Sequence, residues 1–226
     1  MIYNISGISF ECDCNLEENW KKYALSENRE NIFHIHGCQE ENEISGAEIY
    51  HTCKNIECII RIEQDVMVVE KDWKKGNILR IRKRENLYTF LIQAFYTHAV
   101  QRRMLQIHSS LIDDHGRGIM FLGPSGIGKT TQAERWRDYR DAVIINGDMV
   151  FVQEPAEGFL GWGTPWHGSS PYCENASVPL RALVILKQAP ENRIRPLSGF
   201  EMVSEVSHSV FYPTWLENGM DLCLAK

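Results

Sequence analysis

Eight residues from Gly123 to Thr130, Gly-Pro-Ser-Gly-Ile-Gly-Lys-Thr, have the types and spacing of a phosphate-binding loop. Glycines let the backbone turn back on itself, so that successive N–H groups can point at one anion. Lys129 would reach the β- and γ-phosphates of ATP, and the Thr130 hydroxyl would ligate Mg²⁺. A glycine-rich surface turn that carries a lysine is the alternative. The residues expected to bind the nucleotide are Gly123, Pro124, Ser125, Gly126, Ile127, Gly128, Lys129, Thr130 and Thr131.

The segments on either side of this glycine-rich loop (residues 123–130) match its expected role. Residues 119–122 form a short apolar run that ends at the loop, as a buried strand would. Residues 130–140 contain no Gly or Pro and suit a helix. A strand, a loop and a helix N-terminus in this order place phosphate at the positive end of the helix dipole.

A magnesium nucleotide also needs a carboxylate at the end of a neighbouring strand. Residues 142–145 read as a buried strand, and Asp148 follows them after a short turn. Because one helix and one strand separate it from Lys129, Asp148 is expected to lie beside the loop and hold the metal with Thr130. A turn aspartate without a metal contact is the alternative.

His108 is the residue expected to act on the substrate hydroxyl. It lies on a predicted strand, residues 106–112, whose tight turn at 113–118 leads into the strand before the loop. Antiparallel pairing would bring the end of this strand near the root of the loop. An imidazole can orient a substrate hydroxyl or accept its proton near neutral pH. A strand histidine bonded to backbone is an equally good interpretation.

The segment of residues 161–169 combines two tryptophans, one histidine and three glycines. Such a loop can approach a ligand closely, and Trp166 and His167 are the expected substrate contacts, although a structural loop is the alternative. Arg181 could clamp a phosphate, but a surface arginine explains it better.

These features together resemble the C-terminal catalytic domain of HPr kinase/phosphorylase and, more broadly, the ATP-dependent phosphoenolpyruvate carboxykinase group. The resemblance rests on His108, the run from Phe121 to Thr130 and the strand before Asp148, and it extends more loosely through Thr164–Gly168 and Pro179–Leu183. It covers about residues 105–200 and is strongest for small proteins of this type encoded beside peptide-modifying enzymes. It implies a P-loop α/β fold with a mixed sheet and binding of ATP or pyrophosphate with Mg²⁺.

Two positions depart from that family. HPr kinases carry two adjacent aspartates after the next strand, the first being the catalytic base, whereas this chain has Gly147-Asp148. The family's glutamate after the loop serine is replaced by Thr131. These departures argue against HPr as the substrate and leave open a protein that binds ATP without transferring phosphate.

The composition fits an ordinary globular protein. The net charge of −6 argues against a nucleic-acid partner, and no apolar run approaches the ~20 residues of a membrane span, so a cytoplasmic location is expected. The seven cysteines have irregular spacing and contain no C-x-x-C pair, which favours free thiols. Zinc binding through Cys12, Cys14, Cys53 and Cys58 is conceivable but has no supporting histidine spacing.

Residues 1–104 are expected to form a strand-rich α+β region that ends in an amphipathic helix. Residues 56–69 carry its strongest strand signals, residues 75–77 read as a hairpin turn, and Asn86 is the expected N-cap of a helix that runs to about Arg103. His98 is expected to pack in the core. A basic cluster over residues 71–84 suits a solvated sheet face better than a binding patch.

Residues 105–226 are expected to form the nucleotide-binding domain, with a helix over 199–212. The end of the chain, from Trp215 to Lys226, carries no helix stop signal, so this chain is expected to be either truncated or shorter than its relatives.

The predicted function is an ATP- and Mg²⁺-dependent kinase acting on a hydroxyl of a peptide or small protein, with Lys129 and Asp148 in the catalytic set and His108 in place of the missing base. A nucleotide-binding accessory module is the alternative, while a transporter or motor ATPase lacks its second motif. The oligomeric state cannot be predicted.

Overall fold

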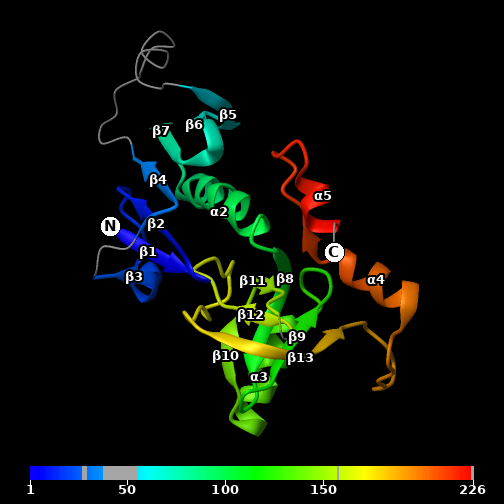
Figure 1. Ribbon diagram of the computed structural model, residues 1–226. Helices are drawn as coiled ribbons and strands as arrows, with labels where there is room; N and C mark the ends of the chain where they lie inside the picture. Colours follow the sequence, from blue (N-terminus) through cyan, green and yellow to red (C-terminus); the bar gives the residue numbers. More distant parts are fainter. Residues whose placement is uncertain (27–29, 38–54, 157, 225–226) are drawn as a thin grey trace. The chain divides into compact units, whose positions relative to one another are not determined.

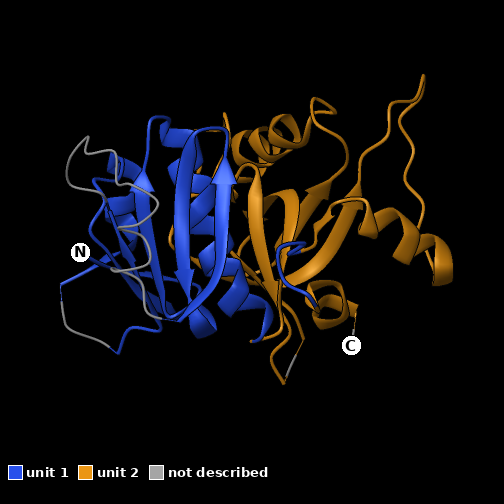
Figure 2. Ribbon diagram, turned by 90° about the horizontal axis from the view of Figure 1, so that it is seen from above, with its two compact units in different colours: residues 1–101, 213–217 blue, residues 102–212, 218–226 orange. Residues whose placement is uncertain are grey.

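The computed structural model describes residues 1–26, 30–37, 55–156 and 158–224 (Figure 1). It divides into two compact units, unit 1 (residues 1–101 and 213–217) and unit 2 (residues 102–212 and 218–226) (Figure 2). Both units combine helices with a mixed sheet, so the chain is a mixed α/β protein. The sequence places the boundary three residues later and assigns the segment 213–217 to the second region.

Within the described residues, seven strands form one mixed sheet in unit 1, in the order β3-β1-β2-β4-β7-β6-β5. The β2–β4 and β4–β7 pairs are parallel, and the other pairs are antiparallel. The strands are β1 (Ile2–Ile5), β2 (Ile8–Cys12), β3 (Ala24–Leu25), β4 (Phe33–His36), β5 (Ile56–Ile62), β6 (Asp65–Glu70) and β7 (Lys75–Arg80), with 3-10 turns η1 (Glu18–Tyr23) and η2 (Lys71–Trp73).

The helix α2 (Arg84–Val100) covers one face of this sheet. The ring of Phe10 lies 6.5 Å from that of Phe95, and Phe33 stacks on His98 at 4.9 Å. His98 also lies 3.0 Å from the carbonyl oxygen of Trp73, so it is a packed histidine, as predicted. With 17 residues, α2 is too short to cross a membrane, and no other helix in the described ranges is long and apolar enough to do so.

The predicted ends of α2 are wrong. The helix begins at Arg84 rather than after an Asn86 cap, and it ends at Val100. A distant residue fixes the chain where the helix begins: the buried Asp65 carboxylate accepts a hydrogen bond from the Asn86 side chain, and it also accepts the backbone N–H groups of residues 82 and 83, just before the helix. An anchor supplied across the fold leaves no local sequence signal.

The predicted hairpin turn at residues 75–77 is also wrong, because these residues belong to β7. A Cβ at Gly76 would lie 2.7 Å from Ile35 Cδ1 and 3.0 Å from Met67 Sδ. Glycine therefore serves close packing here rather than a turn. The chain instead turns at η2, where Asp72 and Trp73 have positive φ angles.

The four-cysteine zinc set is excluded by the sheet order. Cys58 lies on β5 and Cys12 on β2, four strand spacings apart or about 19 Å. Cys53 lies outside the described residues. Cys12, Cys14, Cys58, Cys173 and Cys223 are free thiols.

Unit 2 is built around strands that close on themselves. Among the described residues, β8 pairs with β11, β11 with β12, β12 with β13, β13 with β9, and β9 again with β8. β10 and β14 also pair with β8. The strands are β8 (Met104–Asp113), β9 (Gly118–Leu122), β10 (Val143–Asn146), β11 (Met149–Gln153), β12 (Leu160–Trp162), β13 (Ser177–Ile185) and β14 (Val210–Phe211). Of these, β8, β9 and β10 confirm the strands predicted over residues 106–112, 119–122 and 142–145.

Two apolar clusters fix these strands and the helix α3 (Lys129–Arg140). One contains Leu111, Met120 and Val150 from three strands of the ring. The other joins Ile112 and Phe121 to Ala133 of α3. Because neighbours on a strand point to opposite sides, β8 and β9 contribute to both clusters and hold α3 against the sheet.

The C-terminal part of unit 2 corrects one further prediction. The expected helix over residues 199–212 ends early: α4 spans Gly199–Ser207, and β14 follows it. β14 pairs with β8 through Val210 opposite Ile107. Residues 210–211 are therefore taken up by the sheet and cannot continue the helix. A last helix, α5, spans Gly219–Leu224.

Candidate functional site

The glycine-rich loop connects β9 to α3, in the order that the sequence predicts. Gly126 and Gly128 have φ angles of +78° and +106°, which favour glycine, and within the described part of the chain a Cβ at either position would meet no atom within 4 Å beyond its own chain neighbours. The space beside the loop is therefore open. Because α3 begins at Lys129, the free N–H groups of its first turn lie at this end of the helix.

Lys129 is buried, with 6% of its surface exposed. Its ammonium donates hydrogen bonds to the carbonyl oxygens of Gly123 and Pro124, at 3.0 and 3.2 Å. Burial lowers the pKa of Lys129, and the nearby Asp148 charge opposes this shift in part. A cation that is removed from water and bonded to neutral carbonyls gains from an incoming anion.

Thr130 follows Lys129 in the first turn of α3, and Asp148 lies near enough to the Lys129 ammonium for their charges to interact. The Thr130 hydroxyl donates to the carbonyl oxygen of Gly147 at 3.3 Å, and Gly147 directly precedes Asp148. The structure thus brings the hydroxyl and the carboxylate to the N-terminus of α3. A hydroxyl and a carboxylate are the oxygen ligands that Mg²⁺ accepts beside a phosphate, so the residues present fit this ion.

His108 is hydrogen-bonded to Asp148. Its Nε2 atom lies 3.0 Å from Asp148 Oδ1, and β8 pairs with β11 in a register that sets His108 opposite Met149. The hydrogen bond from His108 is the main cause that lowers the pKa of Asp148; burial opposes it, while the charges of Lys129 and His167 add to it. The carboxylate is therefore ionised near neutral pH.

The segment of residues 161–170, which we name the bracing segment, is tied to the turn before Asp148 by Asn146. This side chain has no exposed surface; its amide nitrogen donates to the carbonyl oxygens of Thr164 and Trp166, at 2.9 and 3.3 Å. Its oxygen accepts the backbone N–H groups of Asp148 and Met149, both at 2.8 Å. One buried amide therefore fixes both the bracing segment and the turn that carries Asp148.

Trp166, one of the two expected substrate contacts in this segment, is buried, with 8% of its surface exposed. His167 and Gly168 instead lie against Asp148. A Cβ at Gly168, which has a φ angle of +56°, would lie 2.6 Å from Asp148 Oδ2. The close approach expected of this segment is thus made to the carboxylate, while His167 Nδ1 bonds the carbonyl oxygen of Ser170.

Ser170 occupies the space that a side chain at position 147 would need. A Cβ at Gly147 would lie 1.8 Å from Ser170 Oγ and 2.4 Å from its Cβ. Ser170 is itself buried, and its hydroxyl accepts the backbone N–H of Tyr172 at 3.3 Å. Glycine at 147 is therefore matched to its surroundings, and a second aspartate would not fit without a shift of Ser170.

Arg181 is not brought to the loop. It lies on β13 beside Leu180, which pairs with Gly118 at the beginning of β9, whereas the loop follows Leu122 at the other end. The parallel register reaches Leu122 only at Ile185. Arg181 is exposed there, so a surface role explains it.

Sequence reasoning missed Asn146 and Ser170. Asn146 ends an otherwise apolar strand, and a polar residue at such a position was the available signal. Ser170 carried no signal, because its role depends on a contact with Gly147 that only the fold creates.

The comparison with curated proteins found no match. A family model described as SynChlorMet cassette protein ScmC matches residues 67–223. This range is more than half of the chain and contains the glycine-rich loop, His108 and Asp148. The chain therefore belongs to the ScmC family of SynChlorMet cassette proteins.

Proposed function

We propose that this protein binds ATP with Mg²⁺ and transfers the γ-phosphoryl group to a hydroxyl of a peptide or small protein. The observation that carries the proposal is the convergence of Lys129, Thr130, Asp148 and His108 at an open glycine-rich loop. On this reading unit 2 has a P-loop core of the HPr kinase type.

The phosphate site needs few changes from the observed geometry. The Lys129 ammonium would exchange its two carbonyl partners for phosphate oxygens and stabilise charge on the transferring group. The first-turn N–H groups of α3 would add their dipoles. Bound Mg²⁺, held by Thr130 and Asp148, would neutralise phosphate charge.

His108 is the proposed base. With its Nε2–H donated to Asp148, Nδ1 carries the lone pair that can accept a proton. The substrate hydroxyl would lose its proton to Nδ1 while its oxygen bonds to the γ-phosphorus. The bond from that phosphorus to the β–γ bridging oxygen breaks, and ADP leaves. Asp148 fixes the tautomer and stabilises the protonated imidazole.

The family supports a partner of this kind. Its description names a cassette, which favours a substrate or partner protein encoded in the same gene group. ATP and Mg²⁺ are abundant in the cytoplasm, where the proposed reaction would take place.

One observation favours a second function, in which ATP binding orders a partner surface without chemistry. Ser170 occupies the space that a side chain at position 147 would need, and position 147 is where HPr kinases carry the catalytic base, so that base is absent here. The accessory reading shares the nucleotide site and differs only in the fate of the γ-phosphate.

Incubation of the protein with γ-labelled ATP and the cassette-encoded peptide separates the two readings. We expect label on the peptide, lost with both Lys129→Ala and His108→Ala, but with ATP binding lost only in the lysine variant. His115→Asn is the matched control: this exposed histidine has a positive φ angle, which asparagine tolerates. Label confined to free phosphate, or transfer unchanged by His108→Ala, would reject the proposed mechanism.

A further inference from the structure

Alternation along two paired strands of unit 1 places four polar side chains on one face of its sheet. β2 and β4 are parallel, with Glu11 opposite His34 and Cys12 opposite Ile35. The backbone N–H of Asp13 continues this ladder to the carbonyl oxygen of Ile35 at 3.1 Å. Because Phe33 faces α2, the side chains of His34 and His36 face away from that helix.

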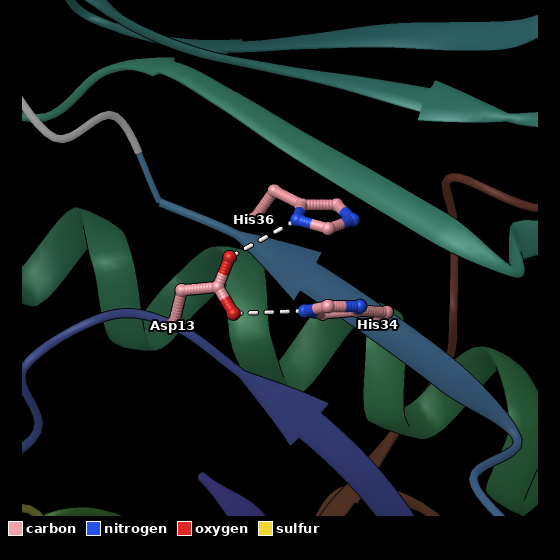
Figure 3. Close-up of side chains that lie close together, drawn as sticks. All are labelled: Asp13, His34 and His36. Atoms are coloured by element: carbon pink, nitrogen blue, oxygen red, sulfur yellow. Dashed lines mark hydrogen bonds and ion pairs between the residues drawn. The ribbon is translucent and has the colours of Figure 1, made fainter.

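The Asp13 carboxylate joins the two imidazoles (Figure 3). His34 Nε2 lies 2.8 Å from Asp13 Oδ1, and His36 Nδ1 lies 3.0 Å from Asp13 Oδ2. The two rings are 3.7 Å apart, and the three candidate ligand atoms lie within 4.8 Å of one another. Two imidazole nitrogens and a carboxylate oxygen thus lie close enough together to share one ion.

We propose that Asp13, His34 and His36 form a binding site for a divalent transition metal of the zinc class. Nitrogen and oxygen ligands bind Zn²⁺ at about 2.0–2.2 Å, which in a tetrahedral site sets neighbouring ligand atoms roughly 3.5 Å apart. The observed nitrogen–oxygen separations of 2.8 and 3.0 Å, one to each Asp13 oxygen, and the 4.8 Å limit on the three-atom set bracket that spacing, so small side-chain rotations reach it. Three protein ligands leave a coordination position open to water or a ligand.

Glu11 supplies an outer partner of the kind that metal-bound histidines have. Its Oε2 atom lies 3.6 Å from His34 Nδ1, the ring nitrogen opposite the one that faces Asp13. This is an ion-pair distance, and a carboxylate that closes from there onto the nitrogen would orient the ring and strengthen it as a ligand. The side chains of His34, Asp13 and His36 are 25, 31 and 38% exposed, so an ion can reach them.

Lys75 is the opposing charge at this site. It pairs with His34 on β7, and its side chain is exposed. A nearby ammonium weakens binding of a dication, so its removal should strengthen binding. This gives a variant whose effect has the opposite sign to those of the ligand variants.

The test is a titration of the reduced, nucleotide-free full chain with Zn²⁺ against a chromophoric chelator, in excess Mg²⁺ to occupy oxygen-only sites. Co²⁺ absorbance reports the coordination. We expect one strong site, weakened at least about 100-fold by His34→Gln, His36→Gln or Asp13→Asn and about tenfold by Glu11→Gln. Lys75→Gln should strengthen binding about threefold.

His208→Ala, an exposed histidine of unit 2, is the control and should leave binding unchanged. If a ligand variant fails to fold, NMR of the wild-type protein decides: Zn²⁺ should shift the ring signals of His34 and His36 and leave those of His208 in place. Absence of an equimolar site, equal binding by folded ligand variants, or shifts at other histidines only would overturn the proposal.

Discussion

The glycine-rich loop and the bracing segment contain three glycines each. Both act on Asp148: Lys129, at the end of the loop, through its charge, and Gly168, in the bracing segment, by lying against the carboxylate. In the loop, added Cβ atoms at Gly126 and Gly128 would enter open space. In the bracing segment, a Cβ at Gly163 would lie 2.1 Å from the carbonyl oxygen of Glu174. The same residue type thus serves backbone conformation beside an open volume in one region and close packing in the other.

This difference separates the part that can receive a ligand from the part that holds the acid. The open loop can change its contacts when an anion enters, since the Lys129 bonds go to carbonyl oxygens of the loop itself. The bracing segment is fixed to β10 by buried hydrogen bonds. Asp148 therefore belongs to a preorganised support, which the role proposed for it would require.

The largest effect is expected from Gly163→Ala. The added methyl would collide with backbone, which cannot move as a side chain can, and the free energy of unfolding should fall by about 4 kcal/mol. Chemical denaturation of the variant and the wild type measures this loss. A loss below about 1 kcal/mol would show that the bracing segment is not tightly packed.

Asn146→Ala should come next. It removes an amide that serves two carbonyl oxygens and two backbone N–H groups, so we expect a loss of about 3 kcal/mol. Denaturation checks the stability. Asn146→Asp is the comparison: it keeps the acceptor for the two N–H groups but sets a buried carboxylate oxygen against the two carbonyl oxygens, so it should cost at least as much as alanine at neutral pH. A smaller loss for aspartate than for alanine would contradict the donor role assigned to the amide.

Gly126→Ala tests the other region. Only the positive φ angle opposes this substitution, so stability should fall by about 1 kcal/mol. The ratio of this loss to that of Gly163→Ala measures the contrast between the two regions. Equal losses for the two variants would remove it.

The smallest effect is a pH dependence from Lys129. Because burial holds its pKa below 10.5, the unfolded chain binds more protons than the folded chain as the pH approaches that value. Lys129 should therefore contribute a rise in stability with increasing pH in the alkaline range below 10.5, and Lys129→Met should abolish this contribution. Denaturation at several pH values measures it, and an unchanged slope in the variant would contradict a buried, charged lysine.

Much of unit 2 can be predicted from the sequence because its signals are local. Apolar runs identify β9 and β10, and the glycine spacing identifies the loop between β9 and α3. The proximity of Asp148 to Lys129 follows from one helix and one strand between them. These inferences need no knowledge of distant contacts.

The failures arise where distant residues decide. Asp65 of β6 anchors the residues just before α2, and contact with Ile35 explains Gly76, so neither could be found from neighbouring residues in the sequence. The Asp13–His34–His36 cluster depends on a parallel strand register that the sequence does not display. The burial of Trp166, predicted as a substrate contact, goes with a hydrogen bond from the distant Asn146 side chain to its backbone carbonyl, which the sequence does not display.

The most direct test of the central claim is calorimetric titration of Mg²⁺–ATP into the wild-type protein, Lys129→Ala and His108→Ala. The account predicts saturable, equimolar binding to the wild type and to His108→Ala, and none to Lys129→Ala. Binding that survives the loss of Lys129, or a wild-type protein that does not bind ATP, would contradict it.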